Sequence, residues 1–209
     1  MSQIQRKPVV PLEAGSGPEN PPCPACGEPL FGWIDTRRGM AGPISRCESC
    51  GLGVVGRPGS TEDALAVLDQ LRAGDEVRIA NRAGFSASLG GAGWAGLEPG
   101  AHYLFTVEAV SRLAAHRDQL VKGRRWVPGA SVLAMWQTIL NGLTFGRNVA
   151  LGALRNEVAV PAEHPWQRRL DAVISVVVAA PAMLVALPLE LVAAALRRGG
   201  AVSLRFELL

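Results

Sequence analysis

The sequence predicts an α+β fold in which a small cysteine module precedes a partial α/β sheet with helices and long hydrophobic C-terminal helices. Three observations predict it: four cysteines fall into two close pairs, helix-like and strand-like patterns alternate over residues 57–130, and residues 172–189 carry no charge. Hydrophobic residues make up 48% of the 209-residue chain and charged residues 19%, which is typical of a globular protein. The net charge of +3 is too small to indicate a nucleic-acid partner.

Residues 1–21 are predicted to form a disordered leader. Arg6 and Lys7 are followed by prolines and glycines, and no apolar stretch of signal-peptide length comes after them. Without an export signal, we expect the chain to be cytoplasmic. In that reducing compartment, paired cysteines more often bind metal than form disulfides.

Residues 22–56 are predicted to fold as a zinc ribbon around one ion. Its ligands lie in two C-x-x-C-G knuckles, Cys23 with Cys26 and Cys47 with Cys50. Two residues between thiolates let both reach one tetrahedral ion, and the glycine after each pair permits a tight turn. Two disulfides or a redox dithiol are the alternatives, which the spacing and the compartment disfavour. Four thiolates leave no position for a water nucleophile, so we expect the zinc to be structural.

Strand-like segments lie between and after the knuckles. Leu30–Ile34 and residues 44–46 are expected to pair across a turn at residues 37–39. Residues 51–56 match the GxGxxG pattern of dinucleotide sites, but this pattern begins inside the second knuckle and no helix follows it directly. We therefore interpret residues 51–56 as the exit strand of the ribbon.

A helix followed by a strand is predicted after the ribbon. Ser60 with Asp63 marks the start of the helix, and Gly74 closes it. The apolar face of this helix consists of Ala64, Leu65, Val67, Leu68 and Leu71. Glu76–Ala80 alternates between apolar and polar residues, as a short strand does.

A loop and a second helix are expected next. Residues 81–96 are rich in glycine and predict a loop. Thr106 is expected to cap a helix that runs to about Asp118, with Val110 and Leu113 on its apolar face.

Two blocks of this region carry a resemblance to a known family. Residues 65–81 read LAVLDQLRAGDEVRIAN, and residues 94–106 read WAGLEPGAHYLFT. The blocks resemble the late helix, L-x-P-G-G turn and following strand, and then the W…P-x-H-x-Y-x-F-T segment, of class I S-adenosylmethionine-dependent methyltransferases that begin with a zinc ribbon. Ala73, Asp75 and Ala80 replace a proline, the second glycine and a proline of that pattern. The resemblance implies that residues 57–130 are the C-terminal half of a methyltransferase-like fold.

The cofactor-binding half of that family has no counterpart in this sequence. Only residues 51–60 separate the last cysteine from the late helix, whereas one βαβ unit needs about 30 residues. We therefore expect no binding of S-adenosylmethionine, and the catalytic residues are unknown. His102 is interpreted as a packed structural histidine beside Tyr103, the alternative being a remnant of a substrate-side position.

A small basic cluster precedes the hydrophobic third of the chain. It consists of Lys122, Arg124 and Arg125 beside Trp126. Anionic lipid or nucleic acid would suit such a cluster, but basic and aromatic residues do not interleave over a longer run. A solvated turn is the favoured interpretation.

Residues 131–198 are predicted to be hydrophobic and helical. The apolar run starting at residue 172 continues to residue 196, interrupted only by Glu190, which reaches the length of a membrane span. Residues suited to a membrane interface flank it, namely Trp166, Arg168 and Arg169 before and Arg197 and Arg198 after. Pro181 and Pro188 argue against a straight span. A further apolar stripe at helical spacing consists of Val132, Met135, Trp136, Ile139, Leu140 and Leu143.

Residues 199–209 are predicted to be a terminal strand, because Val202, Leu204 and Phe206 alternate with polar residues. The methyltransferase resemblance identifies this segment as the final strand of the sheet that contains Glu76–Ala80. A single crossing of a bilayer before it would place the two strands on opposite sides. Two arrangements avoid this conflict: a kinked segment that enters and leaves by the same face, or a long helix that lies in the interface.

These observations lead to three hypotheses of function. The favoured one is a non-catalytic, zinc-binding, methyltransferase-like interaction module. It would be cytoplasmic and associate with the inner face of the membrane. The second is a methyltransferase that acts with a partner chain, and the third is a membrane-anchored zinc-ribbon binding protein. Membrane lipid and a protein partner or second copy are the expected partners. A buried core helix or an oligomer contact is the alternative explanation of the apolar segment.

Overall fold

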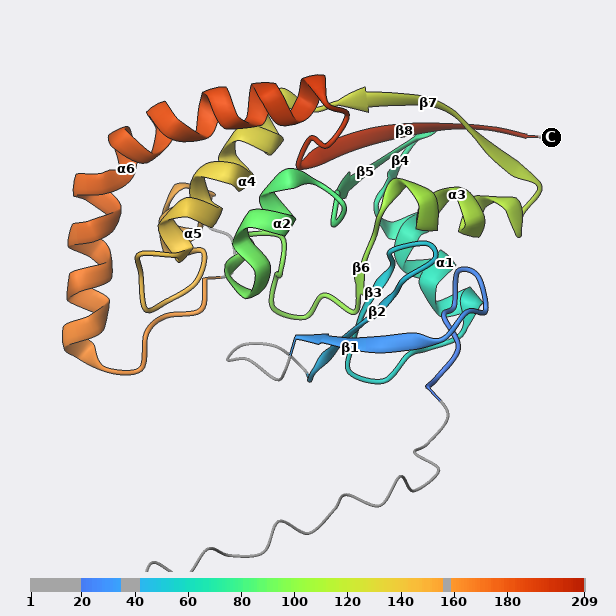
Figure 1. The fold of residues 1–209 in the computed structure, drawn as a ribbon, viewed down its shortest axis with the longest axis horizontal. Coiled ribbons are helices and arrows are strands. Elements are labelled where there is room, and N and C mark those ends of the chain that lie inside the picture. Colours follow the sequence, from blue (N-terminus) through green and yellow to red (C-terminus); the bar gives the residue numbers. More distant parts are fainter. Residues whose placement is uncertain (1–19, 35–41, 156–158, 209) are drawn as a thin grey trace, which may run out of the picture.

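The fold consists of two antiparallel sheets and a layer of helices, as the predicted α+β class requires (Figure 1). It is seen in a computed structural model that describes residues 20–34, 42–155 and 159–208. The first sheet has the order β1 (Leu30–Ile34), β2 (Ile44–Cys47), β3 (Gly53–Val55) and β6 (Tyr103–Leu104). The second has the order β4 (Arg72–Ala73), β5 (Glu76–Ala80), β8 (Ala201–Leu208) and β7 (Gln119–Trp126). The helices are α1 (Thr61–Gln70), α2 (Phe85–Gly90), α3 (Val107–Ala115), α4 (Pro128–Asn141), α5 (Val149–Arg155) and α6 (Pro165–Ala195).

The predicted hairpin between the cysteine pairs is confirmed. β1 and β2 pair in antiparallel fashion with Leu30 opposite Cys47, and β3 adds to the other edge of β2. The exit strand expected within residues 51–56 is β3. The predicted turn at residues 37–39 and most of the predicted leader lie outside the described residues.

Local capping residues in the sequence determine where both predicted helices of the middle region begin. The Ser60 side chain accepts a hydrogen bond from the Asp63 N–H, and the Asp63 carboxylate accepts one from the Ser60 N–H, which forms a capping box at the start of α1. Thr106 caps α3 by accepting a hydrogen bond from the Ala109 N–H. Gly74 has a φ of 63° and forms the tight turn between β4 and β5.

The second sheet joins the middle of the chain to its last strand. β8 lies between β5 and β7, with Val77 opposite Leu204 and Trp126 opposite Val202. The alternation that predicted the strand corresponds to a buried side formed by Val202, Leu204 and Phe206. Because β8 follows α6 directly, both ends of the helical layer connect to this one sheet (Figure 1).

Two predictions for the middle region are wrong. The predicted loop 81–96 contains α2, in which Ser86 and Ala87 are buried. The predicted turn at Lys122 and Arg124 is part of β7. Its charges do not oppose strand formation, because β7 is an edge strand, where charged side chains are common, and Lys122 and Arg124 keep exposed side chains there.

The helical layer is built around α4. Its predicted apolar residues Met135, Trp136 and Leu140 are buried, and the Trp136 Nε1–H donates to the Ala179 carbonyl of α6 at 2.8 Å. Its other face is buried as well, although it is polar. There the Asn141 side-chain oxygen accepts hydrogen bonds from the Gln137 side chain and the Asn148 N–H, both at 2.8 Å.

Candidate functional site

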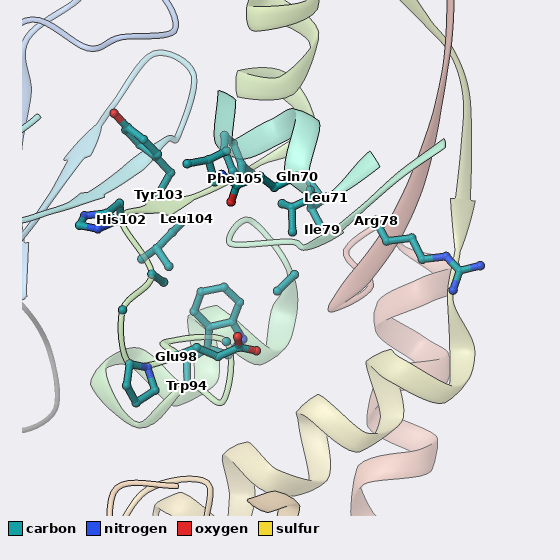
Figure 2. Close-up of a pocket in the computed structure, with 16 residues that line it drawn as sticks. Gln70, Leu71, Arg78, Ile79, Trp94, Glu98, His102, Tyr103, Leu104 and Phe105 are labelled. Atoms are coloured by element: carbon teal, nitrogen blue, oxygen red, sulfur yellow. The ribbon is translucent and has the colours of Figure 1, made fainter. Parts of the chain in front are cut away.

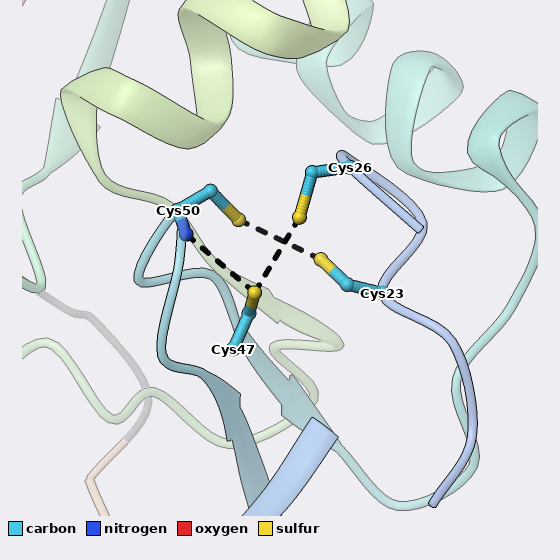
Figure 3. Close-up of side chains that lie close together, drawn as sticks. All are labelled: Cys23, Cys26, Cys47 and Cys50. Atoms are coloured by element: carbon cyan, nitrogen blue, oxygen red, sulfur yellow. Dashed lines mark hydrogen bonds between the residues drawn. The ribbon is translucent and has the colours of Figure 1, made fainter. Parts of the chain in front are cut away.

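The four predicted metal ligands converge at the end of the first sheet (Figure 3). The Sγ atoms of Cys23 and Cys50 are 3.6 Å apart, and those of Cys26 and Cys47 are 3.4 Å apart. All four sulfur atoms lie within 4.8 Å of one another. All four are free cysteines, and three of them are buried.

This arrangement fits one tetrahedral metal ion. Metal–sulfur distances of about 2.3 Å around zinc place thiolate sulfurs about 3.8 Å apart, whereas a disulfide needs about 2.05 Å. The observed separations therefore match shared coordination of one ion and not two disulfide bonds. Gly27 and Gly51, which follow the two pairs, have φ values of 78° and 75°, as the predicted knuckle turns require. The cluster is compatible with zinc.

The close packing of the sulfur atoms affects their ionisation. The hydrogen bond with Cys50 lowers the pKa of Cys23 to about 5, against an opposing effect of burial. The same contact, together with burial, raises the pKa of Cys50. Burial also raises the pKa of Cys26. A bound cation would allow all four thiolates to form at once, because its charge offsets their mutual repulsion.

Both knuckles are attached to helices outside residues 22–56. The Thr61 hydroxyl at the start of α1 donates to the Pro24 carbonyl at 2.7 Å. The Thr106 hydroxyl, which caps α3, donates to the Cys50 carbonyl at 2.6 Å. A single hydrophobic cluster includes Leu30 and Leu52 of the cysteine module together with residues of α1, α3, β5 and β8. The cysteine module and the second sheet therefore share one core.

A partly buried cation lies beside the second knuckle. The Arg82 guanidinium donates to the Gly51 carbonyl at 3.0 Å and stacks 4.1 Å from the centre of the Trp33 ring. Burial lowers the pKa of Arg82 to about 10, so it remains charged at neutral pH. A zinc ion with four thiolates carries a net charge of −2, which a neighbouring arginine stabilises.

The second candidate site is a cavity of about 540 Å³ between α1, β5 and β6 (Figure 2). Trp94, Leu104 and Phe105 contribute apolar walls, and Glu98 and His102 line it as well. The His102 side chain is exposed at this cavity, so the prediction that it is packed as a structural histidine is wrong. The sequence pattern identified the residue but not its exposure.

The third candidate is the outer face of α6. This helix is long and apolar enough to cross a membrane, and only 11% of its most apolar 18-residue window is buried. Arg168 and Arg169 are exposed in its first turns, and from residue 172 to the end of the helix every exposed residue is apolar: Ala172, Val173, Val176, Val177, Ala180, Pro181, Leu184, Val185, Leu187, Pro188, Leu191, Val192 and Ala195. We call these residues the α6 outer face.

The two acidic residues of α6 point inward and do not interrupt this face. Asp171 is buried and accepts hydrogen bonds from the N–H groups of Phe145 and Gly146, both at 2.8 Å. Glu190 is buried and accepts one from the Gly200 N–H at 2.7 Å. Glu190, which interrupts the apolar run in the sequence, therefore lies on the protein side of the helix.

Comparison of the chain with protein-family models, with curated proteins and with solved structures finds no match.

Proposed function

We propose that this protein is a non-catalytic, zinc-stabilised interaction module that associates with a membrane from the cytoplasmic side. The observation that carries the proposal is the α6 outer face, which is exposed and contains no charged residue. Exposed apolar surfaces of this extent mark membrane or protein contacts. Trp166 with Arg168 and Arg169 at one end, and Arg197 with Arg198 at the other, favour a membrane, because these residue types are enriched where helices meet headgroups.

The fold favours a helix that lies in the interface over one that spans the bilayer. A straight 31-residue helix would be about 46 Å long, well beyond the ~30 Å hydrocarbon core. α6 is instead curved around α4 and α5 (Figure 1), and its inner side packs on them. β8 returns the chain to the sheet that β7 left. Insertion of the outer face alone keeps both ends of α6 on the same side of the membrane.

The methyltransferase-like part of the proposal rests on the sequence resemblance. The pairing of β8 with β5 supports it, since the resemblance identifies residues 199–209 as the final strand of that sheet. Zinc as the bound metal is supported by the sulfur separations.

Vesicle binding by variants of the α6 outer face tests the membrane proposal. Val176 is 79% exposed and Leu184 is 78% exposed, so Val176→Asp with Leu184→Asp should leave the fold intact. Loss of two apolar side chains from the bilayer costs about 3 kcal/mol or more, so vesicle affinity should fall at least about a hundredfold.

A matched control places the same changes away from α6. Leu120 and Leu208 lie on β7 and β8 and are 53% and 74% exposed. Leu120→Asp with Leu208→Asp should bind vesicles as the unchanged chain does. Recovery of the unchanged chain entirely in the soluble fraction, at low salt and without detergent, would contradict membrane association.

The cavity of about 540 Å³ favours a second candidate function, that of a methyltransferase acting with a partner chain. Its volume lies within the usual range of about 300–1,000 Å³ for ligand sites, and it combines apolar walls with a few polar groups. Isothermal titration of the purified chain with S-adenosylmethionine distinguishes the two candidates. Saturable binding that is weakened by a substitution at Trp94 would overturn the non-catalytic proposal.

A further inference from the structure

A cavity of about 380 Å³ opens at the C-terminal end of α6, where the outer face meets the second sheet. It is lined by Arg124, Trp126, Ala194, Arg197, Gly199 and Val202. Two arginines and no acidic residue therefore surround it. We call it the arginine cavity.

Arg124 differs from its basic neighbours on β7. Lys122 pairs with Glu207 at 2.5 Å, and Arg125 lies 3.5 Å from Glu76. Within residues 20–34, 42–155 and 159–208, no carboxylate pairs with Arg124. Burial, and then the charge of Arg197, lower the pKa of Arg124. The Arg124 guanidinium also donates to the Arg197 carbonyl at 2.6 Å, which holds the two residues together. The Glu190 carboxylate is buried behind Gly199 and Trp126 and does not line the cavity. The two arginines therefore face the cavity without a paired carboxylate, which favours an anion.

Arg197 has a backbone conformation that favours glycine. Its φ is 57°, and it occupies the position after the C-cap of α6 in a Schellman motif, with Arg197 N–H bonded to Ala194 O and Arg198 N–H bonded to Ala193 O. Glycine is the usual residue there because a Cβ is strained in this region. An arginine at this position suggests that its side chain has a role other than ending the helix.

We propose that the arginine cavity binds the phosphate group of an anionic phospholipid whose acyl chains contact the α6 outer face. Guanidinium groups bind phosphate oxygens in pairs, with directed hydrogen bonds. The exposed side chain of Leu191 lies one helical turn before the cavity wall at Ala194, and Val192 and the C-cap residue Leu196 are exposed at the same end of α6. The geometry thus places apolar surface beside a cationic cavity, as a lipid with an anionic headgroup requires. This inference rests on the proposed membrane association.

The test compares binding of the full chain to phosphatidylcholine vesicles, to vesicles that also contain phosphatidylglycerol, and to inorganic phosphate. We expect tighter binding to the phosphatidylglycerol vesicles. Each arginine contributes about fivefold to binding of an anionic surface, so Arg124→Gln with Arg197→Gln should reduce this affinity about 30-fold. The pair Arg57→Gln and Arg78→Gln removes the same charge from exposed positions outside the cavity, and should have a much smaller effect.

Arg197→Gly separates a binding role from a structural one. Glycine suits the φ of this residue, so the melting temperature should be unchanged or higher, while affinity for phosphatidylglycerol vesicles should fall about fivefold. The double substitution Arg124→Lys with Arg197→Lys keeps the charge but removes the paired hydrogen bonds, and should lose part of the headgroup preference.

Four outcomes are distinguishable. Headgroup preference that is reduced in Arg197→Gly, reduced further in the Arg124 and Arg197 double variant, and kept in the Arg57 and Arg78 control supports the proposal. Equal binding to both vesicle types overturns the arginine cavity as a lipid site and leaves membrane association standing. Binding to neither vesicle type overturns the proposed function itself. Binding of inorganic phosphate that depends on Arg197, without preference for phosphatidylglycerol, assigns the cavity to a soluble phosphate and overturns the lipid.

Discussion

Removal of the metal from the four-cysteine cluster should unfold more than the cysteine module. Cys47→Ser removes one of the metal–sulfur bonds that hold the two knuckles together, and chelation removes all of them. Structural zinc contributes about 10–16 kcal/mol in small cysteine modules at neutral pH, whereas whole domains are stable by only about 5–15 kcal/mol. Residues 22–56 would therefore lose their fold.

The loss should spread because the core is shared. Leu30 and Leu52 of the module are fully buried in the cluster that contains Leu65 of α1 and Leu113 of α3. Withdrawal of two buried leucines from a core costs about 2–5 kcal/mol each. That loss is comparable to the total stability of the rest of the chain, so we expect α1, α3 and the second sheet to unfold with the module.

Metal analysis and hydrogen–deuterium exchange of the same samples provide the assay. Chelation should release the bound metal and increase exchange in residues 22–56, in α1 and in α3. The α4–α6 layer should keep more protection, because its cluster around Met135 and Leu140 is separate. Addition of zinc should reverse the change. If exchange increases only in residues 22–56 while α1 and α3 stay protected, the shared-core argument is refuted.

Three further predictions concern single hydrogen-bonding groups. Thr106→Ala removes the cap of α3 and the bond to Cys50, so the free energy of unfolding should fall by about 1–2 kcal/mol in denaturant titrations, while Thr106→Ser should retain most of it. Asn141→Ala leaves two buried donors unpaired and should cost at least about 2 kcal/mol by the same measurement; no loss would contradict the amide network. The hydroxyl of Ser203 lowers the pKa of Glu76, so this carboxylate stabilises the fold above its unfolded pKa and ceases to do so as the pH falls through its folded pKa. Glu76→Gln should therefore be less stable at neutral pH, and a melting-temperature difference that persists in acid would contradict this reasoning.

Features specified by neighbouring residues could be predicted from the sequence. The C-x-x-C-G spacing is local, so the cysteine cluster and the β1–β2 hairpin follow from residues close in the chain. The same holds for the caps at Ser60 and Thr106, which satisfy the first N–H groups of their helices.

Features that depend on distant partners could not be predicted. β7 is a strand because β8, some 80 residues later, supplies its hydrogen bonds, and its charged sequence alone indicated a turn. The apolar stripe of α4 said nothing of its polar residues, of which Gln137 and Asn141 are buried by the segments around Gly93 and Asn148. The arginine cavity is similarly non-local, because Arg124 and Arg197 lie on separate elements.

Because β8 lies between β5 and β7, the second sheet can be completed only after the last strand of the chain has been synthesised. The strand that closes the sheet is synthesised after α6, about 120 residues later than β5. During synthesis, α1, α3 and the cysteine module have all their local contacts available while the edge of β5 is still open. The apolar helix emerges before the sheet can close, and contacts between residues so far apart form slowly. An α6 that meets a lipid surface at this stage would be shielded from aggregation until β8 completes the sheet.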